Sequence, residues 1–527
     1  MKQLPLFLQS RFLLITSFVY LLIPFLLFVL FWVKLIFALP ITLILLYCLF
    51  ISYKELNLKQ VEYNQNIENI RKNWIIGFCI ILFWLLFSGI GNLSYQNSDY
   101  NIRNAVMRDL VEQSWPVTYS SDIYPVDRRF TENRLMLVYY FGYWLPAAFI
   151  GKFAGLTAAN LFLFFWSLLG ILIAYSLLSQ TIKRVSYKAV IILIIWSGLD
   201  IIGTLSAKYL TTSFIFHTHL EHWADNFKVY AQFSSITTLL YWVFNQTIPL
   251  WITVLLFFNN SNVRTIFLII ALSLFLAPIG TLGFIPFVLL RIGQQIYQNG
   301  FISVLNRYAS LANTLGALFV IGITGLFFST NRAGSMKSLV FFDIVPYTAF
   351  IVLEVGILTF LLFFYYRNKL ALVCFGFLCF IPLIKVGRYY DFAMRASISY
   401  LFLLCILTIK FLLDAKANNQ GKLLMLVYLS IGCITPIFEI TRSVIYTSNH
   451  FLFLTKEKLN SYELSSEMPI RLKTLKDRDF IYDRIKTFSR HNQGIDHTID
   501  QFIGESENNF FADYLLRKNV KISDVTK

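Results

Sequence analysis

The chain alternates between long apolar runs and short polar linkers. The apolar runs cover residues 12–33, 35–52, 74–92, 155–178, 189–204, 236–258, 310–328, 338–365, 370–387, 398–414 and 423–441. A membrane-spanning helix needs about 20 predominantly apolar residues, and most of these runs approach or exceed that length. The pattern therefore predicts an all-α polytopic membrane protein, a helical bundle of about eleven spans.

One further apolar run, 265–290, is interrupted by residues that disfavour a straight helix. It contains Pro278, Gly280, Gly283 and Pro286. Broken helices at membrane depth are tolerated where they are buried in protein, so we expect a re-entrant hairpin of two short halves.

The first long polar interruption runs from Ser94 to Arg134 and mixes acidic and arginine side chains with tryptophan, tyrosine and proline. Long loops inside a compact protein are usually functional or disordered, and the aromatic residues argue against disorder. We predict that 93–134 is a catalytic loop. The aromatic segment that follows, 134–152, contains Pro146 and is expected to form a helix along the membrane surface.

Composition excludes a water-soluble globule, because 57% of the 527 residues are hydrophobic and only 14% are charged. The net charge of +16 is spread over short linkers with no basic stripe, so no nucleic-acid partner is expected. The six cysteines lie within apolar runs without a CxxC pair, which indicates neither disulfides nor metal binding.

The basic linkers orient the chain, since positive residues favour the cytoplasmic side. Placing the N-terminus inside puts the basic linkers near residues 183–188, 264, 291–307, 366–369 and 416–422 inside. The catalytic loop and a second loop, 205–235, then lie outside. We divide the chain into a transmembrane domain, 1–441, and an extracytoplasmic C-terminal appendage, 442–527, that is expected to fold or to pack on the outside loops.

Asp99 is the candidate general base. Apolar Ile102, Val106 and Leu110 recur at helical spacing after it, which predicts a short amphipathic helix. An acid directly after the membrane exit is well placed to face a lipid-borne substrate. The alternative is that Asp99 is an N-cap that forms an ordinary i,i+4 pair with Arg103.

The second outside loop gathers metal-ligand side chains in the stretch HTHLEHWAD. His217, His219, Glu221 and His222 predict a site for a divalent cation, Mg or Mn, or for phosphate, opposite Asp99. Because no HExxH spacing is present, the alternative is an interfacial loop whose side chains hydrogen-bond other loops.

A third element is the stretch GRYYDFAMRAS, in which Arg388, Asp391 and Arg395 precede a span on the outside. A guanidinium matches phosphate oxygens, which favours binding of a lipid phosphate. Snorkelling toward lipid headgroups is the alternative.

These features together resemble the GT-C superfamily of membrane glycosyltransferases. The resemblance rests on an acid soon after the membrane exit, an aromatic segment with Tyr139, Tyr143, Trp144 and Pro146, and a following span that leads to a basic inside loop. It implies a polyprenyl-phosphate-linked sugar donor and a catalytic Asp in the first outside loop, which matches Asp99. The chain departs from the commoner pattern in two extra apolar runs before that loop and in a single acid rather than an adjacent pair.

The expected function is transfer of a sugar from a polyprenyl-phosphate donor to a glycan, lipid or protein acceptor of the cell envelope, at the outer face of the cell membrane. Asp99 is the expected base, and Arg103, Asp109, Arg388, Asp391 and Arg395 are the expected substrate-binding residues. No Walker or GxGxxG motif is present, so no nucleotide cofactor is expected. The alternatives are a flippase or transporter of lipid-linked saccharides, which mid-membrane Asp343 and Glu354 would favour, and an envelope polysaccharide polymerase or ligase.

Overall fold

A computed structural model describes residues 5, 8–55, 62–63, 65–119, 135–215, 219–259, 263–331, 337–386, 391–452, 502–506 and 508–517. Within these residues, ten helical segments are long and apolar enough to cross a membrane, and three shorter apolar helices accompany them. The prediction of a mostly helical, polytopic membrane protein is confirmed.

Helices dominate every part of the described chain. In chain order the α-helices are α1 Ser10–Trp32, α2 Leu35–Glu55, α3 Ile67–Leu86, α4 Tyr100–Glu112, α5 Leu145–Thr181, α6 Tyr187–Ile195, α7 Asp200–Leu210, α8 Ile236–Phe258, α9 Ile266–Leu276, α10 Pro278–Asn299, α11 Phe301–Tyr308, α12 Ala317–Ser329, α13 Ile344–Ile351, α14 Ile357–Tyr366, α15 Lys369–Phe380, α16 Asp391–Ala396, α17 Ile398–Leu413, α18 Asn419–Gly432 and α19 Ile434–Leu452. Short 3-10 or π segments include η2 Ile90–Asn92, η4 Phe141–Trp144, η5 Leu220–Phe227 and η8 Val352–Gly356.

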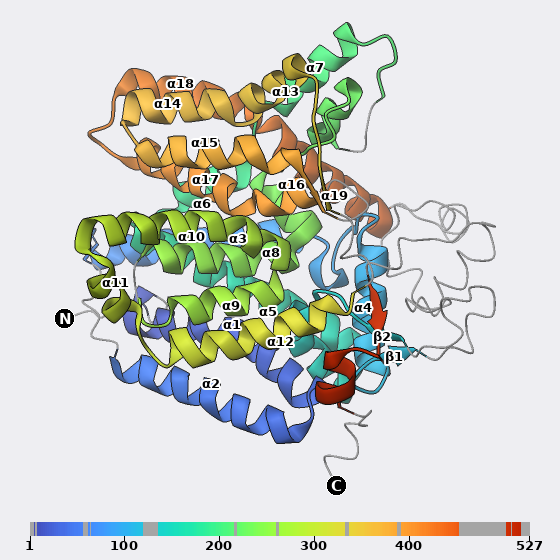
Figure 1. Ribbon diagram of the computed structural model, residues 1–527. Helices are drawn as coiled ribbons and strands as arrows, with labels where there is room; N and C mark the ends of the chain where they lie inside the picture. Colours follow the sequence, from blue (N-terminus) through green and yellow to red (C-terminus); the bar gives the residue numbers. More distant parts are fainter. Residues whose placement is uncertain are drawn as a thin grey trace.

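Short strands lie at one end of the helical bundle (Figure 1). Strand β2 Leu135–Leu137 pairs antiparallel with β1 Thr118–Tyr119 on one side and with β5 Ile503–Glu505 on the other. A separate pair joins β3 Lys337–Leu339 to β4 Ile384–Val386. We call the end that carries the three-stranded sheet the strand end.

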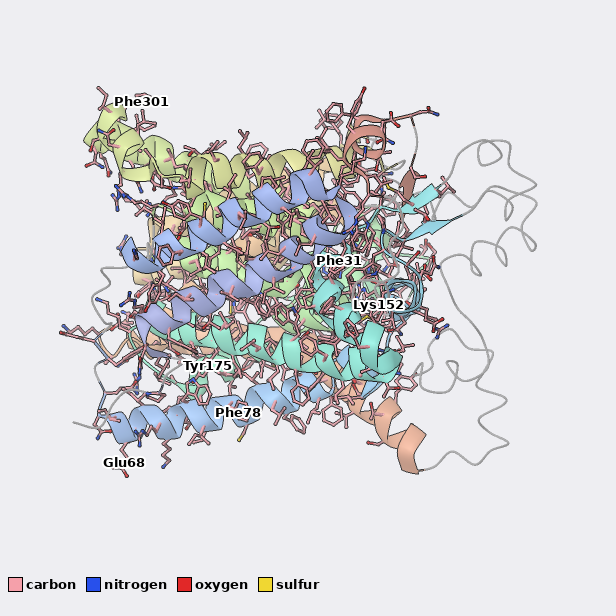
Figure 2. The ribbon with its side chains drawn as sticks, turned by 90° about the horizontal axis from the view of Figure 1, so that it is seen from below. Phe31, Glu68, Phe78, Lys152, Tyr175 and Phe301 are labelled. Carbon is pink, nitrogen blue, oxygen red and sulfur yellow. The ribbon has the colours of Figure 1, made fainter. Side chains whose placement is uncertain are left out.

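The linkers separate into two groups, one at each end of the bundle. At the strand end, Val138 N–H donates to Phe502 O at 2.9 Å and Arg517 N–H donates to Trp32 O at 2.8 Å. At the other end, Val185 N–H donates to Gln65 Oε1 at 2.8 Å. Figure 2 shows the same polarity, with Glu68 and Phe301 at one end and Phe31 and Lys152 toward the other. This arrangement agrees with the predicted alternation of spans, and the compartment that each end faces stays a prediction.

The apolar run 265–290 does turn back on itself, but its two helices differ in length. Helix α9 has 11 residues and α10 has 22, with Ala277 between them. The hydroxyl oxygens of Ser273 and Thr281 lie 3.0 Å apart across the turn, and both are buried. The second half is therefore long enough to be a span by itself.

The segment 134–152 differs from the predicted surface helix at its start. Residues Leu135–Leu137 form β2 because they pair with β5 from the C-terminal tail, and the α-helix begins only at Leu145. That helix then continues to Thr181 with a kink at Gly155, whose φ is 85°. The described part of the tail, residues 502–506 and 508–517, contacts the strand end, and the division of the chain at residue 441 stays a prediction.

Candidate functional site

Asp99 stands at the start of α4, where the sequence places it. Asn97 organises this turn, because its side-chain oxygen accepts from Asp99 N–H at 3.2 Å and its backbone oxygen accepts from Tyr100 N–H at 3.1 Å. The Asp99 carboxylate makes no capping hydrogen bond. The predicted amphipathic helix is confirmed, with Val106 and Leu110 fully buried, and Asp99 occupies its N-cap position without a capping bond from the side chain.

Arg103 holds the Asp99 carboxylate. Its Nη2 donates to Asp99 Oδ2 at 2.8 Å, and the side chain of Arg103 is 5% exposed whereas that of Asp99 is 44% exposed. The guanidinium also lies over the rings of Tyr100 and Phe244, at 5.4 and 5.8 Å from their centroids. Among the described residues, no group bonds to the buried Nη1. The Asp99 carboxylate is therefore accessible, and the buried Arg103 guanidinium that binds it has one N–H group, Nη1, without a described acceptor.

Arg395 approaches the same region from α16. Its guanidinium carbon lies 5.7 Å from the centroid of the Tyr140 ring, and the rings of Tyr139 and Tyr140 are 3.8 Å apart. Burial raises the pKa of Tyr139, the neighbouring Tyr140 raises it further, and the positive charges of Arg103 and Arg395 oppose these effects. Tyr139 therefore lies within electrostatic reach of both arginines.

Of the other predicted substrate-binding residues, the structure describes the side chain of Asp109 alone, and Asp109 lies away from this group. Asp109 is fully buried in α4, and ten residues of helix place it about 15 Å along the axis from Asp99. Arg388 lies outside the described residues. Asp391 begins α16, and the structure describes its backbone only.

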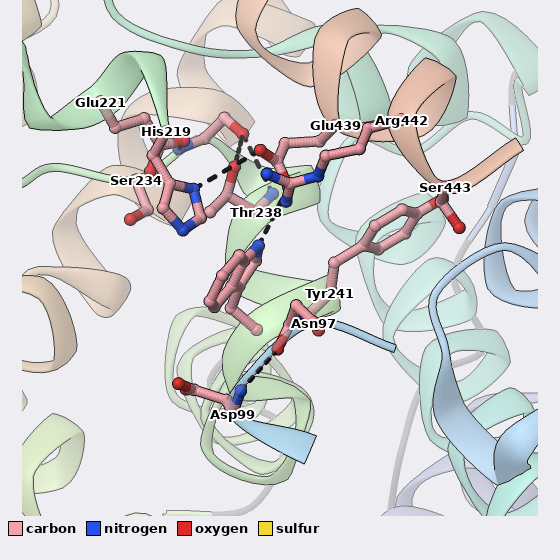
Figure 3. A network of polar contacts seen from close by, with 12 residues as sticks. Asn97, Asp99, His219, Glu221, Ser234, Thr238, Tyr241, Glu439, Arg442 and Ser443 are labelled. Carbon is pink, nitrogen blue, oxygen red and sulfur yellow. Dashed lines mark hydrogen bonds and ion pairs between the residues drawn. The ribbon is translucent and has the colours of Figure 1, made fainter. Parts of the chain in front are cut away.

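A second polar group lies around Glu439, a buried residue of α19. Its carboxylate accepts from Trp242 Nε1 at 2.9 Å and from Arg442 Nη2 at 2.6 Å, and His219 Nδ1 lies 3.4 Å from its other oxygen. The rings of His219 and Trp242 are 3.9 Å apart. Figure 3 shows this group with Tyr241 between it and Asn97.

Helix α8 connects the two groups through consecutive residues. The Tyr241 carbonyl accepts from Asn97 Nδ2 at 3.2 Å, and Trp242 carries the bond to Glu439. The helix is distorted here, since Val243 has φ −137° and ψ 37° and the Thr247 hydroxyl donates to Leu239 O and Val243 O at 3.0 Å each. Adjacent residues of α8, Tyr241 and Trp242, therefore contact the Asp99 group and the Glu439 group.

Sequence reasoning missed Glu439 and Arg442. The predicted span 423–441 contains Glu439, and Arg442 directly follows it. Two signals in the sequence identify this pair. Ionisable residues inside a span are rare and usually functional, and the i,i+3 spacing of Glu439 and Arg442 places both on one helix face.

The predicted metal site is not assembled from the residues that the structure describes. His219 faces Glu439, and His222 Nδ1 lies 3.0 Å from Asp225 Oδ2. Glu221 is 1% exposed and accepts from Ser235 N–H at 2.9 Å and from Gln232 at 2.6 Å. Burial raises the pKa of Glu221, and the neighbouring charge of Asp200 adds to this.

His217 lies outside the described residues. Within the described part of the chain, no three His, Cys, Asp or Glu side chains are grouped to hold a metal ion. These contacts agree with the alternative interpretation of this loop as a set of hydrogen-bonding side chains.

Comparison of the chain with models of protein families, with curated protein sequences and with solved structures gives no match.

Proposed function

We propose that the protein is a membrane glycosyltransferase that transfers a sugar from a polyprenyl-phosphate-linked donor to a glycan, lipid or protein acceptor of the cell envelope. The observation that carries the proposal is the accessible Asp99 carboxylate, held at 2.8 Å by buried Arg103. It lies at the strand end of a bundle of apolar helices. The resemblance of the sequence to the GT-C superfamily supplies the reaction class.

Asp99 has the chemistry that acceptor activation requires. A carboxylate that accepts one guanidinium bond keeps lone pairs free for an acceptor hydroxyl. In the proposed step the acceptor proton moves to Asp99 while the acceptor oxygen forms its bond to the anomeric carbon. The bond from that carbon to the phosphate oxygen breaks, and polyprenyl phosphate leaves with the electron pair.

Arg395 and Arg103 are suited to the charge that develops on the leaving phosphate. Both act on Tyr139 electrostatically, so they belong to one positively charged region. Arg103 has a buried N–H group without a described partner, and guanidinium groups bind phosphate through paired donors. Stabilisation of a departing phosphate is the type of interaction that lowers the barrier of such a transfer.

The remaining parts of the proposal follow from the expected orientation. The site faces the outside of a cell membrane, the donor enters from the bilayer, and no nucleotide takes part. The proposed step is written with the protein's own cations, Arg103 and Arg395.

The test is turnover by the purified protein in lipid nanodiscs. Radiolabelled polyprenyl-phosphate sugars are presented with candidate acceptors, and released polyprenyl phosphate and labelled product are measured together. Stoichiometric release and transfer are expected for at least one donor. Absence of both for every donor, with folded protein in each assay, contradicts the proposal.

Transport of a lipid-linked saccharide is the second candidate, and one observation favours it. Glu354 is 2% exposed within an interrupted span, whereas Asp343 is exposed just before α13. Ionisable groups inside a membrane commonly mark transport pathways. Translocation of a fluorescent donor across proteoliposomes without chemical turnover is the result that would favour transport over transfer.

A further inference from the structure

Asp200 and Glu354 lie side by side inside the helical bundle. The residues before them are joined by a backbone hydrogen bond, since Leu199 N–H donates to Leu353 O at 3.2 Å. A Cβ on Gly198 would lie 2.2 Å from Glu354 Oε2, so a glycine is required there for the acid to fit. The side chains of Asp200 and Glu354 are 1% and 2% exposed.

Each carboxyl group has one oxygen that is fully engaged by neutral donors. Asp200 Oδ2 accepts from the hydroxyls of Ser197 and Thr435, both at 2.9 Å. Glu354 Oε1 accepts from Trp223 Nε1 at 2.7 Å. The other oxygens, Asp200 Oδ1 and Glu354 Oε2, receive no bond from a described donor.

The two carboxyl groups are close enough to act on each other electrostatically, and Asp200 Oδ1 and Glu354 Oε2 are the two acceptors left without a bond from a described donor. Ionised carboxylates have acceptors only, so a hydrogen bond between two carboxyl groups requires a proton on one of them. No lysine, arginine or histidine in the described chain forms an ion pair with either acid. Two buried negative charges without a cation would repel each other strongly, so one of the two acids stays neutral.

The neighbouring titratable groups reinforce this conclusion. Glu221 adds a further acid toward the pair from η5. The Tyr428 hydroxyl of α18 donates to the Glu354 backbone oxygen at 3.3 Å. The side chains of His219 and Arg442 both contact Glu439 instead. The pair therefore lies in a region of excess negative charge.

Three interrupted helices meet at this pair. Asp200 begins α7 after the break 196–199, Glu354 lies in the π segment η8 between α13 and α14, and Thr435 follows the break between α18 and α19. A Cβ on Gly432 would lie 2.9 Å from Gly198 O, so the first and third breaks are also in close contact. All three segments are candidate membrane spans, and interrupted spans commonly bind small cations or protons at their breaks.

We propose that Asp200 and Glu354 form a proton-binding site that holds one proton between two carboxyl groups and closes the junction of the three interrupted helices. Release of the proton places two adjacent charges against Gly198 and separates α7, η8 and α19. The site is independent of the Asp99 chemistry and does not require that the protein is a glycosyltransferase.

The test compares infrared difference spectra of the purified full-length protein in nanodiscs. At neutral pH the wild type is expected to show the C=O stretch of a protonated carboxyl group that Glu354→Gln lacks. Gln keeps the acceptor for Trp223 and its amide donates to Asp200 in place of the proton. Asp343→Asn, at an exposed residue just before the same span, is the matched control and is expected to retain the band.

Equilibrium unfolding in detergent gives the second readout. A folded pair that keeps a proton which the unfolded chain has released loses stability as pH rises. The unfolding constant of the wild type should therefore increase about tenfold per pH unit relative to that of Glu354→Gln, in the pH range in which the unfolded chain has released this proton and the folded pair still holds it. If Glu354→Gln does not fold, the neutral double variant Asp200→Asn, Glu354→Gln carries the same two measurements. An identical carboxyl band in wild type and variant, or parallel pH profiles, would overturn the proposal.

Discussion

The Glu439 group offers a prediction about stability that can be worked from its contacts. Glu439 is 3% exposed and Arg442 is 14% exposed, and the two are joined at 2.6 Å. Breaking a buried ion pair by removing one partner costs about 3–5 kcal/mol. Glu439→Gln keeps an acceptor for the Trp242 indole but leaves Arg442 without its counter-charge. We therefore expect a loss near the lower limit, about 3 kcal/mol.

The matched control is Asp225→Asn in η5, the segment that directly follows His219. The pair of His222 and Asp225 has a similar separation, 3.0 Å, but its side chains are 36% and 21% exposed. Exposed pairs contribute about 0–1 kcal/mol. Equilibrium unfolding in mixed detergent micelles, monitored by tryptophan fluorescence, measures both variants. Equal losses would refute the argument that burial of Glu439 determines its energetic role.

A double-mutant cycle isolates the interaction itself. Glu439→Gln combined with Arg442→Gln removes both charges, so no buried cation is left without a partner. The double variant should lose less stability than the sum of the two single variants, because coupled neighbours are not additive. Strict additivity would show that the two side chains do not interact in solution.

Three further outcomes are expected. Phe502→Ala removes a ring whose centroid lies 4.7 Å from that of Tyr139, and because an aromatic pair contributes about 1 kcal/mol, the donor KM should rise about fivefold. Phe510→Ala, at a 58% exposed residue of the same tail, should leave the donor KM unchanged. Equal KM values for the two variants would show that the tail does not contribute to donor binding. Arg395→Gln removes a charge-assisted contact of about 1.5–3 kcal/mol and should lower kcat/KM for the donor about 10- to 100-fold, and an unchanged value would exclude Arg395 from donor binding. Because burial raises the pKa of Glu221, folding keeps a proton on this side chain that the unfolded chain has lost, so its contribution to stability should fall as pH rises between the unfolded and folded pKa values. Glu221→Gln should make the decline of stability with pH shallower than in the wild type, and parallel unfolding profiles would contradict this.

The sequence was sufficient for features that depend on local pattern. The apolar runs identify the helices because a span must bury its backbone hydrogen bonds internally. The 3.6-residue period of Ile102, Val106 and Leu110 identifies α4, and the i,i+4 spacing identifies the bond between Asp99 and Arg103. Each of these relations lies within one turn or one helix.

Relations between distant segments could not be read in the same way. Leu135–Leu137 is too short for its period to separate strand from helix, and its pairing with β5 joins residues that are far apart in the sequence. The distortion of α8 at Val243 involves no glycine or proline at that position. The contacts of Glu439 with Trp242 and of Asp200 with Glu354 depend on how the helices pack, which a single sequence does not specify.

The catalytic assignment of Asp99 is the central claim, and Asp99→Asn tests it most directly. Asn keeps the size and a hydrogen bond to Arg103 but cannot accept a proton from the acceptor hydroxyl. The measurement is turnover of a radiolabelled polyprenyl-phosphate sugar by purified wild type and variant, with unfolding followed beside it. We expect transfer to fall by about 10²-fold or more while stability changes little, because the Asp99 side chain is 44% exposed and makes no capping hydrogen bond to the helix. Turnover by the folded variant at the wild-type rate would contradict the account.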